Sequence, residues 1–189
     1  RNGTELTGAR EDRGNAVLST MELKAPHAIE LPFERQRRVV AGARIEGRAT
    51  SGSDWELTVM SVHLDNRSRL ARVTASLGVA RLRQAEALVE TLEDDGNDPK
   101  VVAGDLNTWS LGWLERSIPH LSQALSDTPD PQPEITYVKG RIRRRIDYMF
   151  FEFPEGWHGR YERIDHMYGS DHFPLLGWVR FGEADTRAQ

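Results

Sequence analysis

The chain has 189 residues and a formal net charge of −4; 38% of its residues are hydrophobic, 29% are charged and none is cysteine. This composition predicts a soluble globular protein, and we take residues 1–189 as a single domain with loose ends at 1–11 and 182–189. The lack of cysteine excludes disulfides, thiolate metal sites and a cysteine nucleophile. The acidic balance does not favour tight, sequence-blind binding of nucleic acid, although a local basic patch would be enough to meet phosphates.

The sequence contains no run that approaches the roughly 20 apolar residues required for a membrane span. The first residues lack the basic and then apolar pattern of a signal peptide. The chain begins at Arg1 rather than at Met, so we expect a processed or partial chain. Localisation therefore stays open, with a soluble cytoplasmic protein as the default expectation.

The first third of the chain predicts three strands, at 15–19, 38–45 and 55–64, from short apolar or alternating runs. The Gly- and Ser-containing turn between the last two predicts a hairpin. Between the first and second predicted strands, Pro26 and Pro32 indicate a loop or an edge strand.

Apolar residues then recur at spacings near 3.6 from residue 68 to about 94, which predicts a long amphipathic helix. Gln84 interrupts the apolar stripe, and we expect a buried amide that is bonded to a neighbouring loop. The later elements are a strand at 101–106, a short helix at 111–118, strands at 136–138 and 145–151 joined by a basic turn, and a last strand at 174–181. Strands outnumber helices, which favours a mixed α/β (α+β) fold with largely antiparallel sheets.

Asp105 and Asn107 stand at the end of the buried strand. Alternation along an extended chain would turn both side chains the same way, with Leu106 packed behind them. Such a pair could orient a water and take its proton while donating a hydrogen bond to an anion. An Asx turn that closes the strand explains the two residues equally well.

Further polar residues also lie where predicted strands begin or end. Asn15 opens the first strand, His63 is near the end of the third, and Asp171 and His172 precede the last. Asp147 lies within an apolar strand and needs a partner, because an unpaired buried charge is costly. A single histidine or Ser-Asp-His turn is usually structural, but the convergence of these residues at strand ends predicts an active site.

The chemistry that fits these groups is metal-assisted hydrolysis of phosphate esters. Mg²⁺ (or Mn²⁺) prefers oxygen ligands, neutralises phosphoryl oxygens and lowers the pKa of a bound water. Asp105 would position or deprotonate the water, and Asn107 and His63 would donate to phosphate oxygens. His172, oriented by a carboxylate for which Asp147 is the better candidate, would bind or protonate the phosphate.

These residues lie in motifs whose order along the chain resembles the endonuclease/exonuclease/phosphatase family. The motifs are Gly104-Asp105-Leu106-Asn107, Arg145-Ile146-Asp147-Tyr148 and Ser170-Asp171-His172, preceded by Ser61-Val62-His63-Leu64, the helix with Arg81 and Gln84, and residues 12–19. The resemblance covers about residues 12–180. It implies a four-layered sandwich of two mainly antiparallel sheets flanked by helices, and divalent-metal-dependent cleavage of phosphoesters by an in-line water.

By match of motif, the resemblance implies that Asp105 and Asn107 handle the nucleophile and phosphate, that Asp147 pairs with His172, and that Asp171 lies at or near the metal. The predicted site therefore comprises catalytic His63, Asp105, Asn107, Asp147 and His172, substrate-binding Asn15, Arg145 and Trp109, and the metal ligand Asp171.

The sequence departs from the family pattern at its N-terminal end. Family members carry an Asn on a first strand and a metal-binding Glu before the Gly14-Asn15 region, whereas Glu5 and Glu11 lie here in polar loop sequence. We therefore expect a fold that lacks its first strands and whose exposed sheet edge invites self-association. The missing Glu supports an alternative function, a catalytically silent module that binds a phosphorylated ligand or a protein partner.

The fold does not name the substrate. The basic stretch 139–145 could hold a polyanion such as nucleic acid, or be a solvated hairpin tip. Trp109 and Trp113 could stack on a base or meet a lipid, but packing is the commoner role of an aromatic residue.

Overall fold

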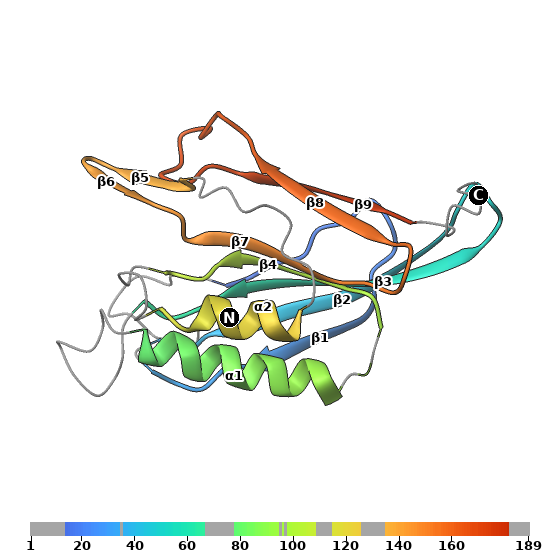
Figure 1. Ribbon diagram of the computed structural model, residues 1–189, viewed down its shortest axis with the longest axis horizontal. Coiled ribbons are helices and arrows are strands. Elements are labelled where there is room, and N and C mark those ends of the chain that lie inside the picture. The colour runs from blue at the N-terminus through green and yellow to red at the C-terminus, as the bar shows by residue number, and fades with distance from the viewer. Residues whose placement is uncertain are drawn as a thin grey trace, which may run out of the picture.

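The computed structural model describes residues 14–34, 36–66, 78–94, 96, 98–108, 115–125 and 135–181. Its largest sheet has five strands in the order β1 (Lys24–Glu30), β2 (Val39–Arg48), β3 (Asp54–His63), β4 (Lys100–Asp105) and β7 (Asp147–Glu152) (Figure 1). All neighbours are antiparallel except β3 and β4, which are parallel. A parallel pair needs a crossover connection, and the chain between β3 and β4 supplies one that contains α1 (Val79–Asp94).

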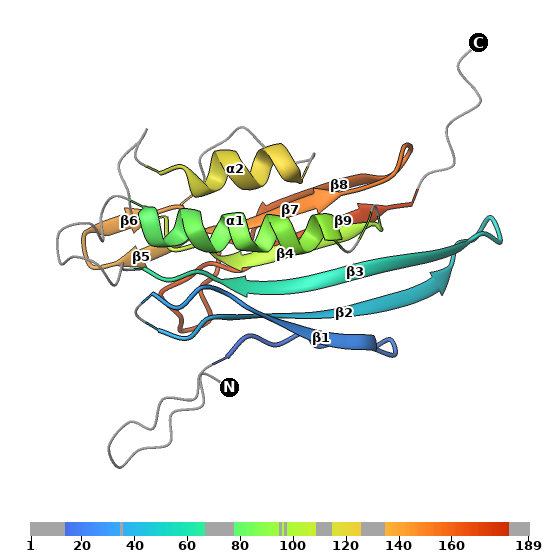
Figure 2. The same ribbon diagram turned by 90° about the horizontal axis from the view of Figure 1, so that it is seen from below.

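Helices α1 and α2 (Ser117–Ala124) cover one face of this sheet (Figure 2). Their apolar stripes, which include Leu88 and Leu121, pack on side chains from alternate positions of the adjacent strands β3, β4 and β7, among them Met60, Val102 and Phe150. Burying each such side chain contributes about 1.5–3 kcal/mol, so this interface is the main core of the described residues. Neither described helix has the length and apolar run that a membrane crossing requires.

A ribbon of β8 (His158–Arg163) and β9 (Leu175–Arg180) packs on the opposite face of β7. Glycines allow this close approach. A Cβ on Gly159 would lie 2.6 Å from the Phe151 ring, and one on Gly177 would lie 2.4 Å from the Met149 sulfur. The mixed α/β class and the packing of sheet on sheet are confirmed, and the described residues show three layers of the predicted sandwich: helices, main sheet and ribbon.

The structure corrects several predicted elements in the first half of the chain. Residues 15–19 form no strand, because β2 and β3 are already paired on both sides and leave no edge for them. The edge structure expected around Pro26 is confirmed, because that segment is the edge strand β1, with an irregular register between Lys24 and His27. The predicted β2–β3 hairpin is confirmed. The described helix α1 starts at Val79, and residues 67–77 lie outside the described residues.

Three further corrections concern the second half. Helix α2 shares only residues 117–118 with the predicted helix 111–118, of which residues 111–114 are outside the described part. Strand β5 (Tyr137–Lys139) pairs with β6 (Ile142–Arg144) through a tight turn at Gly140, whose φ is +59°. The strand that begins after Ile146 instead joins β4, because Phe150 and Phe151 bury opposite faces of the main sheet. The sequence analysis missed β8, whose alternate positions are polar and exposed.

Candidate active site

The register of three strands brings three of the predicted residues side by side. His63 pairs with Asp105 across β3 and β4, and Asp105 pairs with Asp147 across β4 and β7. Residues directly opposite each other in neighbouring strands project to the same face of a sheet. Gly104 makes this register possible, because a Cβ there would lie 1.8 Å from the carbonyl oxygen of Val62.

His172 joins this row from the segment before β9. Its Nδ1 lies 2.9 Å and 3.1 Å from the two carboxylate oxygens of Asp147. A carboxylate only accepts hydrogen bonds, so Nδ1 carries the proton and donates it, which leaves Nε2 for a ligand. The hydrogen bond to Asp147 raises the pKa of His172, although partial burial acts in the opposite direction. Asp147 thus orients His172, as the resemblance implied.

Asp105 and His63 form a second contact, with 3.4 Å between Asp105 Oδ2 and His63 Nε2. Burial, and then the charge of Asp147, raises the pKa of Asp105 to about 6. The His63 side chain is 38% exposed. Even so, desolvation by the surrounding residues, and then the charges of Arg38 and His172, lowers the pKa of His63 to about 4. His63 is therefore uncharged at neutral pH, and a carboxylate with a pKa near 6 beside it suits a proton acceptor.

Asn107 does not continue the strand. Strand β4 ends at Asp105, and Asn107 has a φ of +50°, so side-chain alternation does not extend to it. Its backbone N–H donates to Asp105 Oδ1 at 2.8 Å, which is the Asx turn weighed from the sequence. Its side-chain amide donates to the Leu64 carbonyl at 2.8 Å. Asn107 therefore ties the end of β4 to the end of β3, and its contact with a phosphate stays a prediction.

The remaining predicted residues lie in other surroundings. The Asn15 amide donates to the carbonyls of Val39 and Ser61, and so anchors its segment to β2 and β3. The Arg145 guanidinium lies over the Tyr148 ring at 4.8 Å and donates to the Tyr161 hydroxyl. Trp109 lies outside the described residues. Substrate binding by Asn15, Arg145 and Trp109 stays a prediction.

Asp171, the predicted metal ligand, has a half-exposed side chain whose Oδ2 lies 3.7 Å from Lys139 Nζ. A group that could hold a metal among the described residues is Asp105, Asp147 and His172, which offer one ligand atom each within 4.8 Å of one another, and metal binding by Asp171 stays a prediction. Two carboxylates suit a hard divalent cation. His172 offers no lone pair at Nδ1 while it donates to Asp147, so the donor set fits a cation held by the two carboxylates.

Three residues that support the site were not evident from the sequence. The charge of Arg38, whose side chain is buried, lowers the pKa of both His63 and Asp105. The Tyr137 ring packs edge-on against the His172 ring at 4.9 Å. The Thr136 hydroxyl accepts the backbone N–H of Asp147 at 3.0 Å. None of the three belongs to a motif, and only the burial of polar groups beside the site reveals them.

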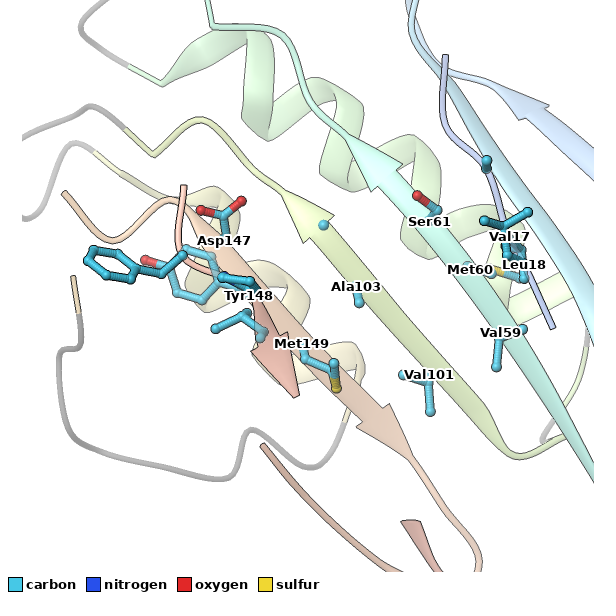
Figure 3. A pocket seen from close by; sticks show the side chains of 15 residues that line it. Val17, Leu18, Val59, Met60, Ser61, Val101, Ala103, Asp147, Tyr148 and Met149 are labelled. Atoms are coloured by element: carbon cyan, nitrogen blue, oxygen red, sulfur yellow. The ribbon is translucent and has the colours of Figure 1, made fainter. Parts of the chain in front are cut away.

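An open groove of about 440 Å³ runs from Asp147 along the sheet face that the helices leave uncovered (Figure 3). Its floor is apolar and comes from β3, β4 and β7, with Val59, Val101, Ala103 and Met149. Val17 and Leu18 lie at one side of it, and Pro174 and Leu175 also line it. Asp147, at one end of the row of site residues, is therefore reached from an open surface.

No family model and no curated protein matches the sequence. Solved structures do match. The catalytic domain of human Nocturnin with bound sulfate is 19% identical, with a TM-score of 0.54 over 84% of this chain and 58% of that one. An endonuclease/exonuclease/phosphatase from Beutenbergia cavernae is 18% identical, with a TM-score of 0.56 over 87% of this chain and 46% of that one.

The mannosyl-6-phosphatase Bt3783 from Bacteroides thetaiotaomicron is 15% identical, with a TM-score of 0.51 over 85% of this chain and 67% of that one. The chain thus spans between 46% and 67% of the length of these three structures. At such low identity the similarity establishes architecture, and it agrees with the row of motif residues on β3, β4 and β7. The chain has the endonuclease/exonuclease/phosphatase fold.

Proposed function

We propose that the chain is a divalent-metal-dependent hydrolase of phosphate esters that acts by in-line attack of an activated water. The observation that carries this proposal is the row of His63, Asp105 and Asp147 on adjacent strands, completed by the hydrogen bond from His172 to Asp147. A mannosyl-6-phosphatase and a sulfate-bound catalytic domain among the structures that share the fold support phosphate-ester chemistry.

Asp105 is the residue to which we assign the attacking water. Its pKa of about 6 leaves it mostly ionised at neutral pH and still basic enough to take a proton. Mg²⁺ or Mn²⁺, held by the carboxylates of Asp105 and Asp147, would neutralise charge on the phosphoryl oxygens and acidify a water.

The two histidines take different roles in the proposal because their protonation differs. His63 is uncharged at neutral pH, so it donates one hydrogen bond to a phosphoryl oxygen without the cost of desolvating a cation. The raised pKa of His172 keeps more of its imidazole protonated, so Nε2–H can donate to a phosphoryl or leaving oxygen. Asp147 holds that ring in place through Nδ1.

The test is hydrolysis of bis(p-nitrophenyl) phosphate with MgCl₂ or MnCl₂, compared with an EDTA-treated sample. We expect metal-dependent turnover that falls by about 10²–10⁴-fold in Asp105→Ala, the usual contribution of a general base. Asp54→Ala is the matched control, because that carboxylate is exposed and its partner among the described residues is the exposed Arg48, at the far end of the β2–β3 hairpin. Equal turnover in wild type and Asp105→Ala, or none that metal stimulates, would contradict the proposal.

A further inference from the structure

The β5–β6 hairpin projects beside the active site, at the end of the main sheet where β7 begins (Figure 1). Its base is attached to site residues at several points. Tyr137 forms a β-bridge with His172, and the Val138 N–H donates to the Asp171 carbonyl at 2.9 Å. The position of the hairpin relative to His172 is therefore set by backbone hydrogen bonds.

The register of the hairpin decides which side chains face the site. Tyr137 pairs with Arg144, and Lys139 pairs with Ile142. Paired residues, and residues two apart on a strand, share a face, so these four side chains lie on one side of the hairpin. The Tyr137 ring contacts the His172 ring, so this side is turned toward the site.

Val138 and Arg143 are paired and therefore lie on the opposite side of the hairpin. Arg143 carries the same charge as Arg144 and is also exposed, but it faces away from His172. Substitution of Arg143 is therefore a matched control for substitution of Arg144.

The charge and reach of the hairpin fit an anion beyond the reacting phosphate. Residues 139–145 carry basic side chains at five of seven positions and no acidic one, in a chain whose net charge is −4. At about 3.3 Å per residue, Lys139 lies about 7 Å along the strand from Tyr137. That reach is long enough to extend from a phosphate at His172 to the next phosphate of a stacked strand, which rises about 3.4 Å per nucleotide.

Among the residues that the structure describes, neither Lys139 nor Arg144 makes a strong internal contact. Lys139 Nζ lies 3.7 Å from Asp171, but both side chains are largely exposed, and such pairs contribute little to stability. Arg144 donates from Nη1 to the Arg143 carbonyl, which leaves further guanidinium N–H groups for a ligand. Both side chains can therefore turn to a phosphate.

We propose that Lys139 and Arg144 form a second phosphate subsite, which binds a phosphate next to the one that is cleaved. This inference rests on the proposed function and narrows the substrate class to molecules that carry at least two phosphates. A nucleic-acid strand and a phosphorylated headgroup share this chemistry.

The test compares ligand pairs that differ by one phosphate. One pair is thymidylyl-thymidine with and without a 5′-phosphate, and the other is glycerophosphoinositol with and without a 4-phosphate. Binding of each compound is measured by titration calorimetry in EDTA, so the result does not depend on turnover or on a metal. Wild type, Arg143→Gln and the double variant Lys139→Gln/Arg144→Gln are compared at low and high salt.

We expect the second phosphate to strengthen binding by about tenfold or more in at least one pair, which then identifies the source of the phosphate. This range corresponds to one or two charge-assisted hydrogen bonds. The advantage should disappear in the double variant, persist in Arg143→Gln and shrink with salt.

The subsite is overturned if neither pair shows the advantage, or if Arg143→Gln abolishes it as fully as the double variant does. Failure of the proposed function has a different signature. Metal-dependent hydrolysis of bis(p-nitrophenyl) phosphate would then be absent, whereas the binding difference between the variants would still decide whether the subsite exists.

Discussion

Replacing Asp147 by asparagine tests the arrangement of the site most directly. The change preserves the shape of the side chain and removes a charge that lies 2.9 Å from His172 Nδ1. The hydrogen bond to Asp147 is the largest cause of the raised pKa of His172, so that pKa falls in the variant. The charge of Asp147 also helps to raise the pKa of Asp105, which therefore falls below its value of about 6.

The size of the effect follows from the role of Asp147 as a positioning residue. Removing a partner that orients an imidazole in such a site typically costs 10–100-fold, or about 1.4–2.7 kcal/mol of transition-state stabilisation. The base and the acid both lose pKa, so the acidic and the basic limb of the rate profile should both move to lower pH.

The assay is kcat/KM for bis(p-nitrophenyl) phosphate between pH 5 and 9, with the His172 ring titrated by NMR. Asp165→Asn is the matched control, because that carboxylate is 80% exposed and pairs with Arg163. Turnover within twofold of wild type, with unmoved limbs and an unchanged His172 titration, would refute the pairing. A loss that higher metal concentration fully restores would show that Asp147 acts through cation binding alone and not through the orientation of His172.

Three further predictions concern stability and metal binding. Gly104→Ala should lower the free energy of unfolding by several kcal/mol, because the new Cβ would lie 1.8 Å from the backbone oxygen of Val62, which cannot move without its strand. An unchanged midpoint of urea unfolding would instead show that β3 and β4 can separate at Gly104. Binding of a cation should release about half a proton from Asp105 at pH 6 and much less at pH 8, because the pKa of Asp105 is about 6 and a cation favours the ionised carboxylate. Calorimetry in two buffers measures the number of protons released. Equal release from that carboxylate at both pH values would contradict this prediction. Gln84→Met should lower the free energy of unfolding by about 1–3 kcal/mol, because Gln84 is fully buried, accepts a backbone N–H at 2.7 Å and donates to a backbone carbonyl at 3.0 Å. The control Glu86→Met changes an exposed residue of the same helix and should cost far less. Equal losses in the two variants would argue against a stabilising role of the Gln84 hydrogen bonds.

Local patterns predicted those features whose cause is local. The apolar period near 3.6 identified helix α1, and alternation with a Gly/Ser turn identified the β2–β3 hairpin. Gln84 was expected to be a buried amide bonded to loop backbone, and the structure confirms it. The motif residues at strand ends, together with the resemblance they carry, indicated the fold and the pairing of Asp147 with His172.

The tertiary structure decided how distant segments pair. The sequence pattern of 145–151 fits a hairpin partner of β5 as well as a neighbour of β4, and burial of Phe150 and Phe151 on opposite faces selects β4. That choice places Asp147 beside Asp105 and leaves β5 to pair with β6 in the basic hairpin. Likewise, the left-handed Asn107 and the buried Arg38 depend on surroundings that no local period encodes. Register is set by which side chains become buried when remote strands meet, and a shift of one residue would turn every site group to the other face.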